Sequence, residues 1–295
     1  MTAGREARGE SRGDRVAGRE EHPKHLEYPK HPEHPEHPEH PEHLEHPEHY
    51  SYSVYADPAM AERFEGMRFS GPIGALIADT QARQIAAFLA PLEGKRILDV
   101  GTGTGRAAIA LAKAGAIVTG VDASREMLAV AERRAREEGA AVTFTHGDAH
   151  RLAFPDRGFD AVVCLRVLMH TPDWRASLGE LCRVAADRVV FDYPSLHSAA
   201  AIQAAVRRVT HLFDKSVEAY RVFAPSAVTG VLEGAGFRVA GEHRQFVLPI
   251  ALHKTVNSAA WTARVEGALD RAGLMRRLGS PVTVVAERAE RIARS

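Results

Sequence analysis

Residues 96–105 read Arg-Ile-Leu-Asp-Val-Gly-Thr-Gly-Thr-Gly, an apolar run that passes directly into three alternating glycines. The segment that follows, up to residue 114, is rich in alanine, the residue with the strongest helix propensity. Glycine accepts positive φ and lets a ligand approach the bare backbone. The stretch therefore predicts a β-strand at 95–100, a tight loop that faces a ligand, and a helix at 105–114.

On both sides of this loop, helical and strand patterns alternate along the chain. Strands that alternate with helices at this spacing predict an α/β fold with a mostly parallel sheet covered on both faces. Such sheets bind ligands beyond the carboxyl ends of their strands. Strands are expected at 95–100, 116–121, 141–145, 159–164, 188–193, 237–248 and 281–287, and helices at 73–90, 105–114, 124–138, 173–185, within 197–234 and at 254–278.

The N-terminal part of this 295-residue chain differs in composition from the rest. Residues 31–49 repeat His-Pro-Glu, with almost nothing apolar to offset the entropy of ordering. We expect 1–49 to be a disordered tail, 50–92 an N-terminal helical cap, and 93–295 the domain that holds the sheet. Successive histidines in a straight polyproline II repeat lie about 9 Å apart, too far to share one ion, so no metal site is expected.

Composition excludes several classes of partner. The 38 basic and 38 acidic side chains balance, and no basic stripe of the kind that binds nucleic acid is present. No run reaches the ~18 apolar residues of a membrane span. Cys164 and Cys182 cannot form a disulfide framework, which fits a reducing cytoplasm. The oligomeric state is left open.

The form of the glycine loop separates classes of nucleotide-binding enzyme. A dinucleotide fingerprint, G-x-G-x-x-G, would need glycine at position 106, which is arginine. A phosphate loop of the Walker type would end in Gly-Lys-Ser or Gly-Lys-Thr, which is also absent. A nicotinamide-dependent reductase is therefore disfavoured.

Two carboxylates follow the next two predicted strands. Asp122 ends the second strand, 21 residues after Gly101, where a carboxylate can accept hydrogen bonds from both hydroxyls of a ribose. The alternative role for Asp122 is that of a helix N-cap, although Ser124 is the better candidate for that cap. Asp148 follows the third strand, where it could meet the amino group of an adenine.

Five stretches together resemble the class I S-adenosylmethionine-dependent methyltransferases, in the small-molecule branch typified by ubiquinone and menaquinone biosynthesis methyltransferases. They are Leu-Asp-Val-Gly-Thr-Gly-Thr-Gly at 98–105, Gly-Val-Asp-Ala-Ser-Arg-Glu-Met-Leu at 120–128, Gly-Asp-Ala at 147–149, Phe-Asp-Ala-Val-Val at 159–163 and Leu-Met-His-Thr-Pro-Asp at 168–173. The resemblance implies a Rossmann-like fold with a mostly parallel seven-stranded sheet, and S-adenosyl-L-methionine as cofactor.

The resemblance also assigns residues to that cofactor. The glycine loop would pass under its methionine part, and residues after the second and third strands would hold its ribose and adenine. Two residues past the fourth strand would lie beside the sulfonium. The residues so assigned are Gly101, Thr102, Gly103, Asp122, Ala123, Met127, Asp148, Ala149, Leu165 and Arg166.

A catalytic base assists methyl transfer only if the acceptor is a hydroxyl or a weakly acidic carbon. Three candidates lie on the ligand side of the predicted sheet: His170 after the fourth strand, Asp192 at the end of the fifth, and His197 after it. Each has a structural alternative, because His170 could fix a helix entry, Asp192 could anchor a turn, and His197 could start a helix.

Two helical insertions into the methyltransferase fold are expected, at about 197–223 and 254–278. They would act as lids that exclude water from the acceptor. Aromatic residues in 50–72 could fold over the cofactor or form ordinary core. Residues 183–187 replace the Leu-Lys-Pro-Gly-Gly turn common in the family before its fifth strand, so a tightened turn is expected there.

The expected function is methyl transfer from S-adenosylmethionine to a small, partly apolar metabolite, with an O-, C- or N-acceptor. One alternative is methylation of a macromolecule, although Cys-Leu-Arg-Val at 164–167 lacks the Asp/Asn-Pro-Pro-Tyr/Phe motif of base-directed amino-methyltransferases. The other is a non-catalytic cofactor-binding protein whose His-rich tail captures metal.

Removal of the His-Pro-Glu segment tests the domain prediction. A protein lacking residues 1–48 should keep its melting temperature and its affinity for S-adenosylhomocysteine, because no packed surface is lost. Thermal unfolding and calorimetry of both proteins measure this. An insoluble truncated protein, or one that no longer binds the cofactor, would place the segment in the fold.

Overall fold

The computed structural model describes residues 52, 55–199, 201 and 221–289. The tail expected at 1–49 lies outside the described residues, and so does most of the insertion expected at 197–223.

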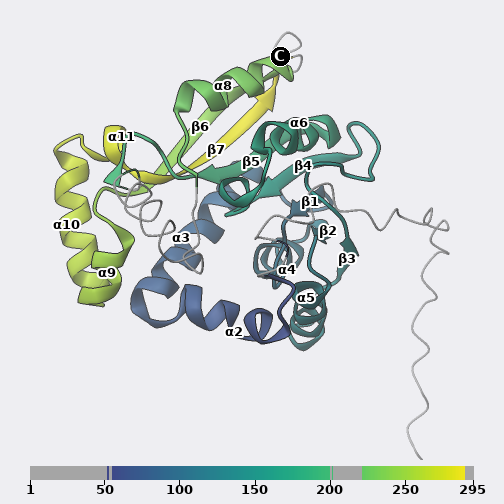
Figure 1. The fold of residues 1–295 in the computed structure, drawn as a ribbon, viewed down its shortest axis with the longest axis horizontal. Coiled ribbons are helices and arrows are strands. Elements are labelled where there is room, and N and C mark those ends of the chain that lie inside the picture. The colour runs from purple at the N-terminus through teal and green to yellow at the C-terminus, as the bar shows by residue number, and fades with distance from the viewer. Residues whose placement is uncertain (1–51, 53–54, 200, 202–220, 290–295) are drawn as a thin grey trace, which may run out of the picture. The chain divides into compact units, whose positions relative to one another are not determined.

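A seven-stranded sheet runs through this part, in the order β3-β2-β1-β4-β5-β7-β6 (Figure 1). Neighbouring strands from β3 to β5 pair in parallel, whereas β7 pairs antiparallel with both β5 and β6. The predicted mostly parallel seven-stranded sheet is thus confirmed, with one antiparallel strand inserted. The strands are β1 (Arg96–Val100), β2 (Ile117–Asp122), β3 (Val142–His146), β4 (Phe159–Cys164), β5 (Ala185–Tyr193), β6 (Phe237–Phe246) and β7 (Ser280–Arg288).

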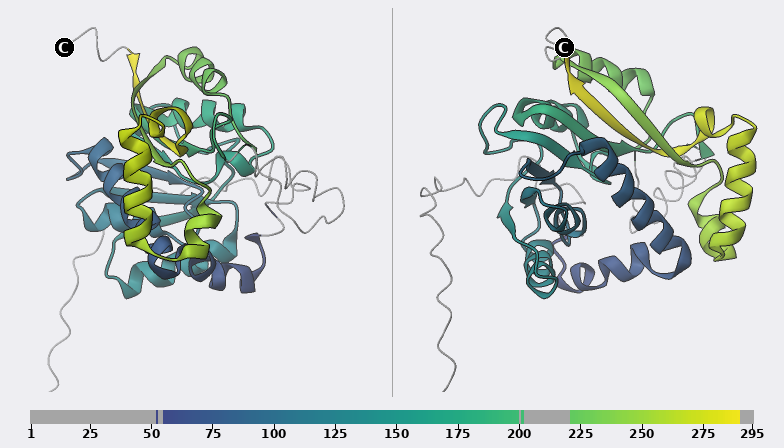
Figure 2. Two further views of the ribbon diagram at one scale, coloured as in Figure 1. Left: turned by 90° about the vertical axis from the view of Figure 1, so that its left-hand side faces the viewer. Right: turned by 180° about the vertical axis from the view of Figure 1, so that it is seen from behind.

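Helices cover both faces of the sheet (Figures 1 and 2). Side chains of α6 and α8 share a core with one face, and those of α3 and α4 share a core with the other. No helix in the described residues is both long and apolar enough to cross a membrane. The helices are α2 (Pro58–Phe69), α3 (Gly71–Leu89), α4 (Arg106–Lys113), α5 (Arg125–Glu137), the 3-10 helix η1 (Leu168–His170), α6 (Trp174–Val184), α8 (Pro225–Gly234), α9 (Ile250–Val256), α10 (Ala259–Arg271) and α11 (Met275–Leu278).

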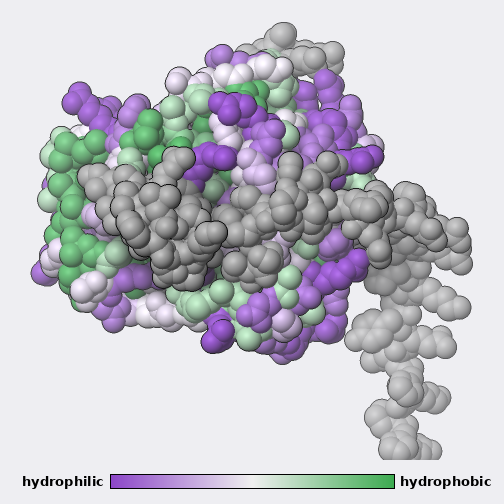
Figure 3. Space-filling view, viewed as in Figure 1, coloured by the Kyte–Doolittle hydropathy of each residue, from purple (hydrophilic) through white to green (hydrophobic). Residues whose placement is uncertain are grey.

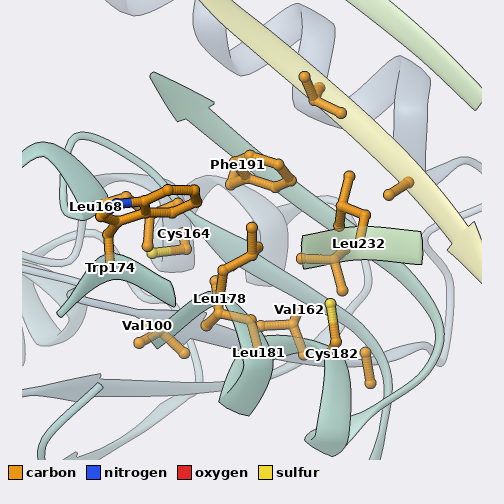
Figure 4. Packing of buried hydrophobic residues seen from close by; sticks show 14 of the residues in the cluster. Val100, Val162, Cys164, Leu168, Trp174, Leu178, Leu181, Cys182, Phe191 and Leu232 are labelled. Atoms are coloured by element: carbon orange, nitrogen blue, oxygen red, sulfur yellow. The ribbon is translucent and has the colours of Figure 1, made fainter. Parts of the chain in front are cut away.

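The central strands are apolar on both faces because both faces are covered. Along β4, Val162 and Cys164 enter the core under α6, whereas Ala161 and Val163 enter the core under α3 and α4. Figure 4 shows the first of these cores, where Trp174 and its helix lie over the strands. Cys164 is fully buried, and burial raises the pKa of its thiol well above the usual value, so it acts as a packing residue.

Helix α6 ends at Val184 and β5 begins at Ala185, so the turn before the fifth strand is reduced to a direct junction. Strand β5 therefore starts three residues earlier than the pattern predicted at 188. Its extra residues pair with the start of β4, where Phe159 lies opposite Ala185 ahead of an irregularity in the register.

The predicted helix at 73–90 and the predicted helical stretch at 254–278 are both present, with boundaries that the sequence pattern did not give. The helix expected at 73–90 begins at Gly71 and is preceded by α2, from which Ser70 separates it. Both helices carry proline in the first turn, where its missing N–H is not needed. The helical stretch expected at 254–278 is α9, α10 and α11, and α9 ends at Asn257, whose φ of 52° breaks the helix.

Helices α9 and α10 form a pair beside the β6 and β7 end of the sheet (Figure 2). On this side of the molecule, hydrophobic residues gather at the surface in Figure 3. Leu252 and Val256 of α9 are both exposed to about two fifths.

A buried polar network fastens the two helices to the end of β6. The Glu266 carboxylate of α10 accepts the backbone N–H of Val247 at 2.8 Å and that of Leu248 at 3.0 Å. The fully buried His253 of α9 lies 2.8 Å from Glu266 through Nε2 and 3.0 Å from Thr262 through Nδ1. One carboxylate therefore satisfies two backbone amides and one imidazole.

Replacement of that carboxylate should destabilise the protein. Glu266→Leu leaves two buried N–H groups without an acceptor, and it should lower the free energy of unfolding by about 1.5–3 kcal/mol, the range for hydrogen bonds to charged groups. Urea denaturation measures the change. Glu242→Leu, at an exposed position of β6, is the matched control and should change stability by less than about 0.5 kcal/mol. Equal stabilities of the two variants would contradict this account.

Candidate functional site

A cavity of about 310 Å³ opens at the carboxyl ends of the parallel strands. Its walls include the residues that follow β1, β2, β3 and β4 and the last part of β5. This is the edge at which a mostly parallel sheet binds ligands.

The loop after β1 forms the floor of the cavity and depends on glycine. Gly101 and Gly103 have φ values of 68° and 54°, in the left-handed region. The N–H groups of Gly101 and Thr102 both donate to the carbonyl of Val121, at 2.8 and 3.0 Å, which ties the loop to β2. A side chain at Gly101 would overlap that of Val167, whereas a Cβ at Gly103 would meet nothing within 4 Å. Gly103 therefore presents bare backbone to open space.

Asp99, within β1, stabilises the loop after this strand through a hydrogen bond with Thr102. Its carboxylate is 2% exposed and accepts a hydrogen bond of 2.7 Å from the Thr102 hydroxyl. Burial raises the pKa of Asp99 to about 6, although the Thr102 hydrogen bond and the charge of Arg106 oppose this rise. Asp99 was not predicted as a site residue, although a single charged residue within the apolar run Ile-Leu-Asp-Val was a signal for such a role.

Asp122, at the end of β2, ties the first two ligand loops together. Its Oδ2 accepts the N–H of Gly103 at 2.8 Å, and its Oδ1 accepts that of Ser124 at 2.9 Å. Ser124 itself caps α5, since its Oγ accepts the N–H of Met127 at 3.0 Å. Burial raises the pKa of Asp122. Each carboxylate oxygen has a second lone pair with which it can accept a ligand hydroxyl.

Asp148, after β3, forms hydrogen bonds with His150 and with Tyr52 of the N-terminal segment. Its Oδ1 accepts the backbone N–H of His150 at 2.9 Å and lies 2.7 Å from Nδ1 of the same residue. The N–H of Asp173 donates to Nε2 of His150, so the proton of that ring sits on Nδ1 and points at Asp148. The Tyr52 hydroxyl donates to Oδ2 at 2.8 Å, which brings the N-terminal segment over this wall.

The N-terminal segment supplies both core and cavity lining, the two alternatives left open for residues 50–72. Tyr55 and Phe64 pack edge to face with ring centroids 6.0 Å apart, against a small core that includes Met127. The same two rings line the cavity, and the carbonyl of Tyr55 accepts the Ser124 hydroxyl at 2.7 Å. The segment is thus joined to the loop that follows Asp122.

The structure places the three candidate bases differently. His170 is buried in η1 and lines the cavity, with its ring centroid 6.4 Å from that of Tyr55. Asp192 lines the cavity from β5. His197 is exposed and is not among the lining residues; its backbone N–H donates to the Ser195 hydroxyl at 3.2 Å.

Asp192 is 1% exposed, and only one of its two carboxylate oxygens has a hydrogen-bond partner in the described part of the chain. Its Oδ1 accepts the backbone N–H of Arg166, while its Oδ2 has no hydrogen-bond partner in the described part of the chain. Burial raises the pKa of Asp192, against the opposing charges of Arg166 and Arg106. Arg166 adopts a φ of 63°, a conformation that non-glycine residues rarely adopt and that gathers at functional sites.

The cavity brings together every residue that the resemblance assigns to the cofactor. They come from four loops that are separate in sequence and adjacent at one sheet edge. The lining includes Gly101, Thr102, Gly103, Asp122, Ala123, Met127, Asp148, Ala149, Leu165 and Arg166.

The far side of the cavity contains residues that the sequence analysis missed. His243 and Gln245 of β6 and Thr283 of β7 line it, as do Arg68 of α2 and Lys254 of α9. Burial lowers the pKa of His243. The signal available was the alternation of polar residues at 243 and 245 within a strand. Within the described ranges, no three His, Cys, Asp or Glu side chains are placed to hold a metal ion.

Comparison with known proteins identifies relatives of the chain. The profile of a methyltransferase domain family matches residues 97–188. The chain is 36% identical to a demethylmenaquinone methyltransferase of Thermus thermophilus over 186 residues, which cover 56% of this chain and 84% of that protein. It is 45% identical to a ubiquinone biosynthesis O-methyltransferase of Ralstonia nicotianae over 94 residues, or 32% of this chain and only 39% of that relative.

Solved structures share the fold. The magnesium protoporphyrin IX methyltransferase of Synechocystis PCC 6803, solved with bound SAH, superposes with a TM-score of 0.59 at 19% identity, over 81% of this chain and 98% of that one. A [4+2]-cyclase superposes with a TM-score of 0.52 at 22% identity, over 71% of this chain and 80% of that one.

The burial of Asp99 should make stability depend on pH. Because its pKa rises from 3.8 to about 6 on folding, the folded protein binds the extra proton, and stability falls as pH increases from about 4 through about 6. Asp99→Asn keeps an acceptor for Thr102 and removes the charge, so it should gain about 2–3 kcal/mol relative to the wild type between pH 4 and 7.5.

Urea denaturation of the ligand-free protein at several pH values measures this difference. Asp79→Asn, at an exposed position of α3, is the control and should follow the wild type. If the free energies of unfolding of Asp99→Asn and the wild type changed with pH in the same way, ionisation of Asp99 would not destabilise the folded protein, and the prediction would be wrong.

Proposed function

The chain belongs to the class I S-adenosylmethionine-dependent methyltransferases, and we propose that it methylates a small, partly apolar metabolite whose reacting group lies beside Asp192. The observation that carries the proposal is the composition of one cavity. It joins the ten residues assigned to the cofactor with a buried carboxylate, one oxygen of which has no hydrogen-bond partner among the described residues.

The residues of the cavity fit the cofactor. Gly103 offers bare backbone in open space, as a closely held ligand requires. In our proposal Asp122 and Asp148 accept hydrogen bonds from the ribose hydroxyls and the adenine amino group, and Met127 flanks the adenine ring. S-adenosylmethionine supplies a methyl group on a positively charged sulfur, which is already a good leaving group.

The acceptor in this proposal has a flat, partly apolar body. The cavity wall provides aromatic and aliphatic surface from Tyr55, Phe69, Ile77 and Ile250. The names of the relatives support such a body, because one acts on demethylmenaquinone and another in ubiquinone biosynthesis. The comparison with a porphyrin methyltransferase supports the fold alone.

Asp192 is our choice for the group that receives the acceptor's proton. A carboxylate whose pKa is raised by burial is a stronger base than an exposed one, and its Oδ2 is unoccupied by other protein groups in the described chain. His170, whose ring packs on Tyr55, is assigned to the cavity wall. His197 has no part in the proposal because it lies outside the lining.

Alignment contributes the larger part of the rate enhancement in this scheme. Orientation of two reacting groups is worth up to about 7–11 kcal/mol, whereas a positioned base contributes about 10²–10⁴-fold. We assign residues 50–92 to a cap over the cofactor, and 93–295 to the catalytic domain. The helices α9 to α11, in the insertion expected at 254–278, would exclude water from the acceptor.

One experiment separates cofactor binding from proton removal. Wild type incubated with labelled S-adenosylmethionine and a metabolite extract should label a small molecule, which then serves as substrate. Asp192→Asn should lower turnover of that substrate about 10²–10⁴-fold while S-adenosylhomocysteine still binds with micromolar affinity by calorimetry.

His170→Phe is the matched control, because it keeps a ring against Tyr55, and it should retain more than about a third of wild-type turnover, well above the residual activity left by losing a base. Binding of NADPH in place of S-adenosylhomocysteine would contradict the cofactor. Unchanged turnover of Asp192→Asn would contradict the base.

A further inference from the structure

Three polar residues lie opposite one another across the last three strands of the sheet. Asp192 of β5 pairs in register with Thr283 of β7, and Thr283 pairs in register with His243 of β6. Residues directly opposite in antiparallel strands point to the same face, so these three side chains form one row. Gln245, two positions further along β6, lies on the face of His243. All four residues line the cavity.

Both ends of this row have unsatisfied polar atoms. Within the described residues, Oδ2 of Asp192, Nε2 of His243 and Nε2 of Gln245 are buried and have no hydrogen-bond partner. A buried polar atom without a partner costs about 1–3 kcal/mol, so such atoms are rare unless a ligand satisfies them. Three of them on the wall of one cavity point to a molecule that contacts both ends of the row.

The two ends require different chemical groups. Asp192 offers an oxygen that accepts a hydrogen bond, which suits the hydroxyl or other donor that reacts. The amide nitrogen of Gln245 can only donate, so the far end suits an oxygen that accepts. Neighbouring strands lie about 4.8 Å apart, which places the backbones of β5 and β6 about 10 Å from each other. One hydroxyl cannot reach both ends.

The surroundings of the far end favour an uncharged group. Burial alone lowers the pKa of His243, with no charged neighbour contributing, so the ring is neutral at pH 7. The cations of the cavity have partners in the protein: Lys254 donates to the carbonyl of Arg68 at 3.1 Å, Arg68 donates to the Tyr55 hydroxyl at 3.1 Å, and Arg106 donates to the side-chain oxygen of Gln81. The charge of Arg166 acts on Asp192, at the opposite end of the row.

Building on the proposed function, we propose that Gln245 and His243 form a second anchor for the methyl acceptor, which holds an uncharged oxygen at the end of the molecule remote from the reacting group. Thr283 lies under the middle of the bound molecule. The substrate is therefore an elongated ring compound with a donor at one end and a carbonyl, ether or similar oxygen at the other. The two residues are specificity determinants, since the reacting atoms lie at Asp192.

A matched pair of phenols tests the anchor. 4-Hydroxyacetophenone and 4-ethylphenol have similar size and the same hydroxyl, and only the first carries a remote carbonyl oxygen. Calorimetry with the full-length wild type should show about 3- to 10-fold tighter binding of 4-hydroxyacetophenone, the gain from one or two neutral hydrogen bonds. Gln245→Leu and His243→Phe should each reduce this preference, and the double variant should abolish it.

Stability distinguishes the anchor from a structural role. Gln245→Leu removes a buried donor without a partner, so its melting temperature should equal or exceed that of the wild type. Glu242→Gln, exposed on the same strand and outside the cavity lining, should leave both the preference and the melting temperature unchanged.

Two further results would overturn the anchor. One is equal binding of the two phenols by the wild type. The other is binding of 4-hydroxybenzoate more than tenfold tighter than 4-hydroxyacetophenone, which would show that the far end takes a charge. The titrations are run with and without S-adenosylhomocysteine, so that failure of cofactor binding would contradict the proposed function and still leave the preference measurable.

Discussion

Three carboxylates at one edge of the sheet, two of them buried and that of Asp122 half-buried, are the constraint on which the rest of the cavity depends. Asp99, Asp122 and Asp192 lie on three parallel strands, and burial raises the pKa of each. Hydrogen bonds from the loops offset much of that cost: backbone N–H groups of Gly103, Ser124 and Arg166 point at Asp122 and Asp192, and the Thr102 hydroxyl points at Asp99. Two of these donors, Gly103 and Arg166, have positive φ.

This arrangement makes the walls of the cavity interdependent. Asp122 binds the glycine loop and the start of α5 with a single carboxylate. Ser124, next to it, both caps α5 and donates to the carbonyl of Tyr55. The N-terminal segment is therefore positioned by the same loop that would hold a ribose. Asp122 and Ser124 therefore connect the glycine loop to the N-terminal segment through hydrogen bonds.

The sequence predicted what is local in the chain and missed what depends on strand order. The loop after β1, Asp122 and Asp148 could be found because each directly follows a strand, and parallel strands end at one edge. The contribution of β6 and β7 could not be found, because β7 runs between β5 and β6 and reverses direction, which no local pattern specifies. His243 and Gln245 read as ordinary strand residues.

The antiparallel insertion of β7 has a consequence for how such a protein can diverge. Residues that would contact the cofactor come from β1 to β4 and their loops, and the methyltransferase profile matches the same part of the chain, 97–188. Asp192, Thr283 and His243 lie beyond it, joined by pairing across strands. Under the proposed function, mutations in β6 and β7 would alter the choice of acceptor without disturbing the cofactor loops, so duplicated copies of one gene could acquire new substrates while inheriting the methyl donor intact.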